Sequence, residues 1–181
     1  MKPLNSFIWI AILCAALAWL LSTGSEPPGW AGDEMSDTAR CAKIEALYRD
    51  YKTEFPGVQD IEPAEAMQLL KEGKALFIDV REEKEQKVSM LPSAITEKEF
   101  LKDPGRFRDR TLIGYCTISY RSGKLAESLK ARGITLYNLK GGLLAWVHAG
   151  GKVYDRNGET IRIHVYGRQW DLGPKGYETV W

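Results

Sequence analysis

A cysteine lies where a predicted buried strand meets a predicted helix. It opens the segment Cys116-Thr117-Ile118-Ser119-Tyr120-Arg121, which follows the apolar run 111–115 and leads into the helical pattern 121–132. The start of a helix presents unpaired backbone N–H groups and partial positive charge, so this loop is expected to bind anions. Cys116 is then expected to be held as a thiolate, the nucleophilic form of the side chain. The alternative is a buried, unreactive thiol.

The rest of this loop is predicted to form the substrate site. Arg121 carries a permanent charge, so we expect it to hold an anionic substrate or to lower the pKa of the cysteine. Thr117, Ile118, Ser119 and Tyr120 are expected to contact the substrate.

Predicted strands and helices alternate through the middle of the chain. Strands are expected at 58–61, 75–80, 111–115 and 135–139, and helices at 63–72, 97–102, 121–132 and 143–148. Such alternation predicts an α/β fold, a parallel sheet with helices on both faces. In sheets of this kind ligands bind beyond the carboxyl ends of the strands, which is where the cysteine loop lies.

Two charged residues end the predicted strand 75–80. Asp79 and Arg81 lie at the same edge of the sheet as the cysteine loop, so both are candidates for the edge of a pocket. A carboxylate and a guanidinium this close also form ion pairs that fix a loop. We favour this second, structural role.

Four motifs in this order resemble a rhodanese (sulfurtransferase) domain. They are the strand end Asp79-Val80-Arg81, the segment Ser89-Met90-Leu91-Pro92-Ser93-Ala94-Ile95, the cysteine loop, and Gly141-Gly142 followed by Trp146. The resemblance extends roughly from Gly57 to Tyr154 and implies that Cys116 carries sulfur as a persulfide. The loop has six residues from cysteine to arginine, as in sulfurtransferases, whereas the related phosphatases have one residue more.

The chain departs from the family pattern in two places. Met90 stands where the family usually has a histidine, and Ser89 and Ser93 replace two glycines. This segment is expected to pack the fold rather than to act in catalysis. The loop residues between Cys116 and Arg121 are uncharged, so thiosulfate should bind less tightly than in relatives with cation-rich loops.

These observations favour a sulfurtransferase that moves sulfane sulfur from thiosulfate, a persulfide or a polysulfide. The acceptor is expected to be a thiol, which includes the thiol of an acceptor protein, or another nucleophile. The alternatives are a non-catalytic rhodanese-like module that binds a partner or senses sulfur species, and a cysteine-based phosphatase or arsenate-handling enzyme, which the short loop disfavours. No cofactor and no metal are expected, because His148 and His164 are isolated from each other and from other ligands.

The first residues form an apolar leader, predicted to be a membrane anchor or a signal peptide. Residues 7–21 are fifteen apolar residues without a charge, and Lys2 precedes them. As a helix they cover about 22 Å, less than the roughly 30 Å of a bilayer core, but extension over 4–23 would span it. Acidic residues follow the leader, which predicts that the rest of the chain lies on the extracytoplasmic, periplasmic side, anchored to the inner membrane. Without the leader the charges balance at 24 basic and 24 acidic residues, and no basic stripe suggests nucleic-acid binding.

We expect four segments: a hydrophobic leader (1–24), a linker and helix (25–55), a rhodanese-like domain (56–155), and an aromatic-rich extension (156–181). The helix is predicted to begin near Ser36, and Cys41 is interpreted as a small buried residue on it rather than a partner for the persulfide. In the extension, Asn157-Gly158 predicts a β-hairpin in which Ile161, Ile163 and Val165 face one way and Arg162 and His164 the other. Its aromatic residues are expected to pin the extension to the domain, near the candidate site.

Overall fold

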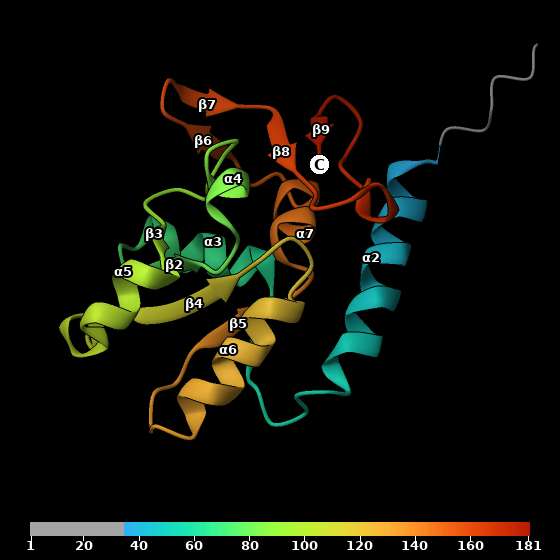
Figure 1. Cartoon of the computed structure of the whole chain (residues 1–181). Helices are drawn as coiled ribbons and strands as arrows, with labels where there is room; N and C mark the ends of the chain where they lie inside the picture. The colour runs from blue at the N-terminus through green and yellow to red at the C-terminus, as the bar shows by residue number, and fades with distance from the viewer. Residues whose placement is uncertain (1–34) are drawn as a thin grey trace, which may run out of the picture. The chain divides into compact units, whose positions relative to one another are not determined.

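The computed structural model describes residues 35–181 (Figure 1). The predicted leader (1–24) and most of the predicted linker lie outside the described residues. Within the described part of the chain, no helix combines the length and the apolar character that crossing a membrane requires.

The core of the fold is a parallel sheet of five strands in the order β1-β5-β4-β2-β3. The strands are β1 (Asp60–Ile61), β2 (Ala75–Asp79), β3 (Ile95–Thr96), β4 (Thr111–Tyr115) and β5 (Tyr137–Leu139). The helices are α2 (Asp37–Lys52), α3 (Pro63–Lys71), α4 (Glu83–Gln86), α5 (Glu97–Lys102), α6 (Tyr120–Lys130) and α7 (Gly142–His148), with a 3₁₀ turn at Pro104–Phe107. The predicted parallel α/β sheet is therefore confirmed.

Helices cover both faces of the sheet because its central strands are apolar on both sides. Phe77 and Ile113 pack with α3 and α7 in one core, whereas Ile78 and Leu112 pack with α5 and α6 in the other. This alternation follows from the two-residue period of a strand. Trp146 of α7 is fully buried and contacts Phe77 edge to face at 5.1 Å.

The predicted boundaries agree with the structure to within a few residues. β4 and α5 have the predicted bounds, while β1 begins at Asp60 instead of Val58. α6 begins one residue before the prediction, because Ser119 adopts a left-handed conformation with φ +77° and ends the loop there. The two-residue β3 and the four-residue α4 were not predicted, since segments this short carry no periodic pattern.

Helix α2 begins next to Ser36, as predicted, but its cysteine is not buried. The Ser36 hydroxyl accepts a hydrogen bond from the Ala39 N–H at 3.2 Å, and Ile44 and Tyr48 are buried. The interpretation of Cys41 as a small buried residue is wrong, because Cys41 is exposed. It lies in a surface depression beside Ala145 and His148, where α2 is not covered.

The C-terminal extension forms the predicted hairpin and then departs from the prediction. β6 (Val153–Asp155) and β7 (Gly158–Thr160) pair antiparallel around Asn157-Gly158. The chain bends at Ile161, and β8 (Arg162–His164) pairs instead with β9 (Glu178–Val180), which is parallel to it; a 3₁₀ turn, Arg168–Trp170, lies between them.

The bend at Ile161 also changes which side chains of the extension are buried. Ile163 and Val165 are buried as predicted, but Ile161 is 57% exposed. His164 was predicted to face away from them, yet it is buried, and its Nδ1 accepts the Tyr166 N–H at 3.0 Å. The assumption of one continuous strand over 159–165 caused both errors.

The start of α7 holds the loop that follows β4. The Leu143 N–H donates to the Cys116 carbonyl at 2.8 Å, and the Leu144 N–H donates to the Thr117 carbonyl at 3.2 Å. Gly142 permits this approach, because its φ is +59° and a Cβ on it would lie 2.4 Å from the Cys116 oxygen. The Gly-Gly motif therefore serves the close contact between α7 and the loop.

We predict that Gly142→Ala destabilises the protein more than a matched glycine substitution does. Gly133 also has a positive φ, +76°, but a Cβ there meets no atom within 4 Å. Gly133→Ala should therefore cost only the backbone strain of about 1–2 kcal/mol, and Gly142→Ala about 1–3 kcal/mol more from the clash. Urea denaturation of both variants measures the difference, and equal losses would contradict the steric argument.

Candidate functional site

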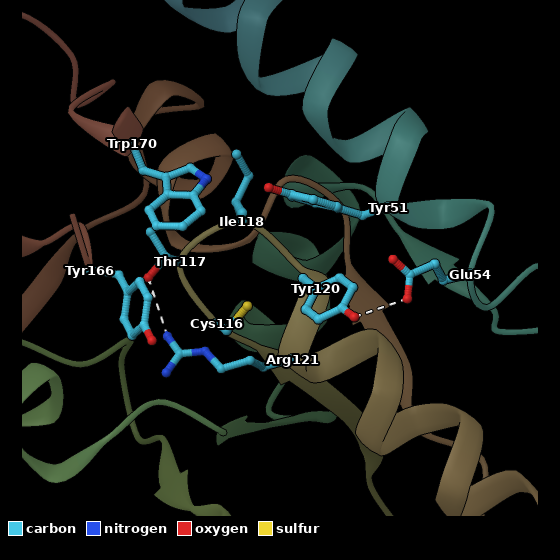
Figure 2. A pocket seen from close by; sticks show the side chains of 9 residues that line it. All are labelled: Tyr51, Glu54, Cys116, Thr117, Ile118, Tyr120, Arg121, Tyr166 and Trp170. Atoms are coloured by element: carbon cyan, nitrogen blue, oxygen red, sulfur yellow. Dashed lines mark hydrogen bonds between the residues drawn. The ribbon is translucent and has the colours of Figure 1, made fainter. Parts of the chain in front are cut away.

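Cys116 lies in a pocket of about 410 Å³ at the carboxyl end of β4 (Figure 2). Among the described residues, the pocket is lined by Tyr51, Glu54, Cys116, Thr117, Ile118, Tyr120, Arg121, Tyr166 and Trp170. Only 2% of the Cys116 surface is exposed, so the sulfur is reached through this pocket rather than from open solvent. The prediction that the loop lies at the carboxyl edge of the sheet is confirmed.

Four of the five other loop residues, Thr117, Ile118, Tyr120 and Arg121, line the pocket, and Ser119 does not. The Ser119 side chain is buried and donates to the Leu139 carbonyl of β5. Its own carbonyl accepts a hydrogen bond from the Asn138 side chain at 3.2 Å. The expectation that the Ser119 side chain contacts a substrate is corrected: this residue turns the chain from the loop into α6.

Arg121 is paired with a buried carboxylate that the sequence analysis missed. Its two terminal nitrogens donate to Glu85 of α4, at 2.6 Å to Oε2 and 2.8 Å to Oε1, and the Glu85 side chain is fully buried. Thr117 also donates to Glu85, at 3.3 Å. The acidic run 82–85 looks like a solvated surface in the sequence, so the fold alone distinguishes Glu85 from its neighbours.

The pKa of Glu85 is lowered by its partners. Burial by itself raises the pKa of this carboxyl group, but several interactions outweigh burial. These are the hydrogen bonds from Arg121 and the Glu82 N–H, together with the charges of Arg121 and Arg81. Burial likewise favours a lower pKa for Arg121, yet the hydrogen bonds to Glu85 and the charge interactions with Cys116 and Glu85 raise it. Both groups are therefore charged at neutral pH.

Asp79 and Arg81 form a buried ion pair and do not line the pocket. Their side chains are completely buried and 2.7 Å apart, and Arg81 also donates to the Ser89 carbonyl. The Tyr115 hydroxyl donates to Asp79 and accepts from the Leu91 N–H. The favoured structural role is confirmed, and the alternative role at the pocket edge is wrong: the pair fixes the segment that follows β2.

The walls of the pocket come from segments on either side of the central domain. Tyr51 and Glu54 come from α2 and the turn after it, and Tyr166 and Trp170 come from the C-terminal extension. The expectation that the extension packs near the site is confirmed, while the contribution of α2 was not foreseen. Its Tyr51 shares a packing face with Ile44, so the sequence alone marks it as a core residue.

The remaining candidates lie elsewhere. Cys41 and His148 share a different surface depression, and neither lines the Cys116 pocket. The His148 Nε2 is 2.8 Å from the Leu172 carbonyl. Across residues 35–181 no cluster of histidine, cysteine and carboxylate side chains is suited to hold a metal ion.

Comparison with known families identifies the central part of the chain. Residues 62–149 match the family model described as a rhodanese-like domain, within the range expected from the motifs. This part of the chain therefore resembles a rhodanese-like domain, and its parallel sheet is flanked by helices on both faces. Helix α2 and the C-terminal extension lie outside the matched residues.

Several proteins are similar to this chain over part of its length. An uncharacterized protein of Bacillus subtilis, YqhL, is 38% identical over 84 residues, which are 44% of this chain and 64% of that protein. The match thus spans less than two thirds of the length of this relative. A rhodanese-like domain protein from Staphylococcus aureus is 28% identical, with a TM-score of 0.43, over 49% of this chain and 91% of that one. The polysulfide-sulfur transferase homodimer from Wolinella succinogenes is 23% identical, with a TM-score of 0.48, over 64% of this chain and 90% of that one.

We predict that Glu85→Gln lowers stability at neutral pH and that this loss shrinks in acid. The pKa of Glu85 lies below its ordinary value of 4.5 in the folded protein. Its contribution is therefore complete above that value and is lost as the pH falls through the folded-state pKa. The free energy of unfolding at neutral pH should fall by about 1–3 kcal/mol, because Arg121 loses a charged partner.

Urea denaturation at neutral pH and again well below the ordinary pKa measures both effects. Glu83→Gln is the control, because Glu83 lies on the same helix with its side chain 79% exposed. It should change stability little at either pH. An equal loss for Glu85→Gln at both pH values would show that the carboxylate charge is not what stabilises the loop.

Proposed function

We propose that this protein is a sulfurtransferase in which Cys116 carries sulfane sulfur as a persulfide. The observation that supports it most directly is the position of Cys116. The cysteine opens a six-residue loop of a rhodanese-like domain and lies inside a pocket beside an arginine fixed by Glu85. Candidate donors are thiosulfate, persulfides and polysulfides, and the candidate acceptor is a thiol, including one on a protein.

The transfer takes place in two displacements on sulfur. The Cys116 thiolate attacks the outer sulfur of a donor R–S–SH; a bond forms between the two sulfurs, and the donor's S–S bond breaks. The leaving thiolate RS⁻ takes the electron pair, and Cys116 becomes a persulfide. An acceptor thiolate then attacks the outer sulfur of that persulfide and restores the Cys116 thiolate. No net oxidation or reduction occurs.

The loop and its neighbours supply the electrostatics of both steps. Helix α6 begins four residues after Cys116, and its N-terminal end favours negative charge. Arg121 adds a cation that Glu85 holds in one orientation. The negative sulfur of the thiolate and of the persulfide is stabilised by both groups.

We predict that Cys116 gains one sulfur atom, about 32 Da, when the full chain is treated with a sulfane-sulfur donor. Mass spectrometry of the tryptic peptide measures the gain. Cys116→Ser should show none, whereas Cys41→Ser should behave as wild type, because Cys41 lies outside the pocket. An unmodified Cys116 in folded protein would refute the enzymatic proposal and leave a binding or sensing module.

We also propose that the catalytic domain functions on the extracytoplasmic side of the membrane, because Lys2 precedes the apolar leader and acidic residues follow it. Alkaline phosphatase fused after Gly24 should be active, and a reporter that works only in the cytoplasm should be silent at the same point. The reverse pattern would refute this topology. Fractionation then distinguishes an anchor, which keeps the intact chain in the membrane, from a cleaved signal peptide.

A further inference from the structure

Two pairs of aromatic side chains face each other across Cys116. Tyr51 and Tyr120 contact edge to face, with ring centres 5.2 Å apart, on one side of the pocket. Tyr166 and Trp170, with ring centres 5.5 Å apart, form the other side. Figure 2 shows the Cys116 sulfur between the two pairs. A flat or apolar group bound here would contact rings on both sides of the reacting sulfur.

The charges around the pocket do not favour a small anion. Of the described residues that line it, Glu54 and Arg121 are the charged ones. Glu85 balances the positive charge of Arg121 through two hydrogen bonds, and the Arg121 guanidinium lies 5.0 Å from the centre of the Tyr166 ring. Glu54 accepts a hydrogen bond from the Tyr120 hydroxyl at 2.9 Å and keeps a carboxylate at the rim. Glu54, Glu85 and Arg121 together carry a net negative charge.

The size of the pocket agrees with this chemistry. A volume of about 410 Å³ falls in the range of roughly 300–1,000 Å³ typical of pockets for small organic ligands. The aromatic residues Tyr51, Tyr166 and Trp170 lie outside the residues that match the rhodanese-like domain. The matched residues therefore supply the nucleophile, and segments outside the match supply the walls that select its substrate.

We propose that the sulfur donor is an organic sulfane compound with an apolar, ring-sized body and no more than one negative charge, in preference to thiosulfate. The aromatic pairs hold the organic body, and Cys116 attacks the sulfane sulfur at its end. The inference rests on the sulfurtransferase function proposed above and specifies its substrate class.

Three donors that share a terminal sulfane sulfur distinguish the effect of the organic body from the effect of the charge. Benzenethiosulfonate and methanethiosulfonate both carry one negative charge and differ in the ring, whereas thiosulfate carries two charges and no organic group. In each case the Cys116 thiolate takes the outer sulfur, the bond between the two donor sulfurs breaks, and a sulfinate (or sulfite) leaves with the electron pair. We expect kcat/KM with the full chain and excess cyanide as acceptor to be at least about tenfold higher for benzenethiosulfonate than for methanethiosulfonate, and lowest for thiosulfate.

Two variants, one from each wall, test whether the aromatic pairs cause the preference. Trp170→Ala and Tyr51→Ala should each reduce the ratio of the two thiosulfonate kcat/KM values by about threefold or more. Trp181→Ala is the control, because Trp181 belongs to the same extension, is 53% exposed and is not among the pocket-lining residues. It should leave the ratio unchanged. Thermal unfolding of each variant shows whether it folds, and the two walls provide independent tests.

Binding to Cys116→Ser distinguishes this inference from the proposed function. This variant cannot accept sulfur, so calorimetry with the two thiosulfonates measures the preference of the walls alone. Tighter binding of benzenethiosulfonate than of methanethiosulfonate would support the preference of the walls for an aromatic body. Absence of sulfur transfer to wild-type Cys116 would refute the sulfurtransferase proposal, and it would leave this binding result unchanged. Equal binding and equal kcat/KM for the two thiosulfonates, or a preference for thiosulfate, would overturn the substrate class while leaving sulfur transfer intact.

Discussion

The shape of the cysteine loop depends on two backbone hydrogen bonds from another helix. The first N–H groups of a helix have no partner within it, and in α7 two of them donate to the carbonyls of Cys116 and Thr117. These two hydrogen bonds fix the direction of both carbonyls. Gly142 makes the approach possible, since any side chain would meet the Cys116 oxygen. A motif some 25 residues downstream thereby determines the backbone geometry at Cys116.

The charged groups near the site divide into a structural pair and a pair at the pocket. Asp79 and Arg81 are entirely buried and tie β2 to the segment around Ser89. Glu85 and Arg121 join α4 to the start of α6, with Arg121 partly open to the pocket. Because Glu85 accepts two hydrogen bonds from the Arg121 guanidinium, this ion pair also fixes the orientation of the cysteine loop. A buried charge without such a partner would cost several kcal/mol.

The sequence predicted the sheet and the position of the cysteine loop because both leave periodic or local patterns. The strand 111–115 and its cysteine loop are contiguous, so the prediction and the structure agree there. Glu85 and Tyr51 were missed for a different reason: their roles arise from contacts with residues 36 and 69 positions further along the chain, Arg121 and Tyr120. Ile161 shows a third limit of sequence-based prediction. The alternation of apolar residues over 161–165 does not reveal the bend at Ile161, which leaves this side chain exposed. Local patterns thus located the cysteine loop, whereas the surroundings of the site required the fold.

The pocket unites parts of the chain that are synthesised at very different times. Tyr51 precedes the residues that match the rhodanese-like model, and Tyr166 and Trp170 follow them, so bringing all three to one pocket closes a loop of more than 100 residues. Closing such a loop has an entropic cost that grows slowly with its length, and contacts between the extension and the rest of the chain must offset it. One wall of the Cys116 pocket therefore depends on whether the C-terminal extension is packed, and removal of Tyr166 and Trp170 would open that side of the cysteine to solvent.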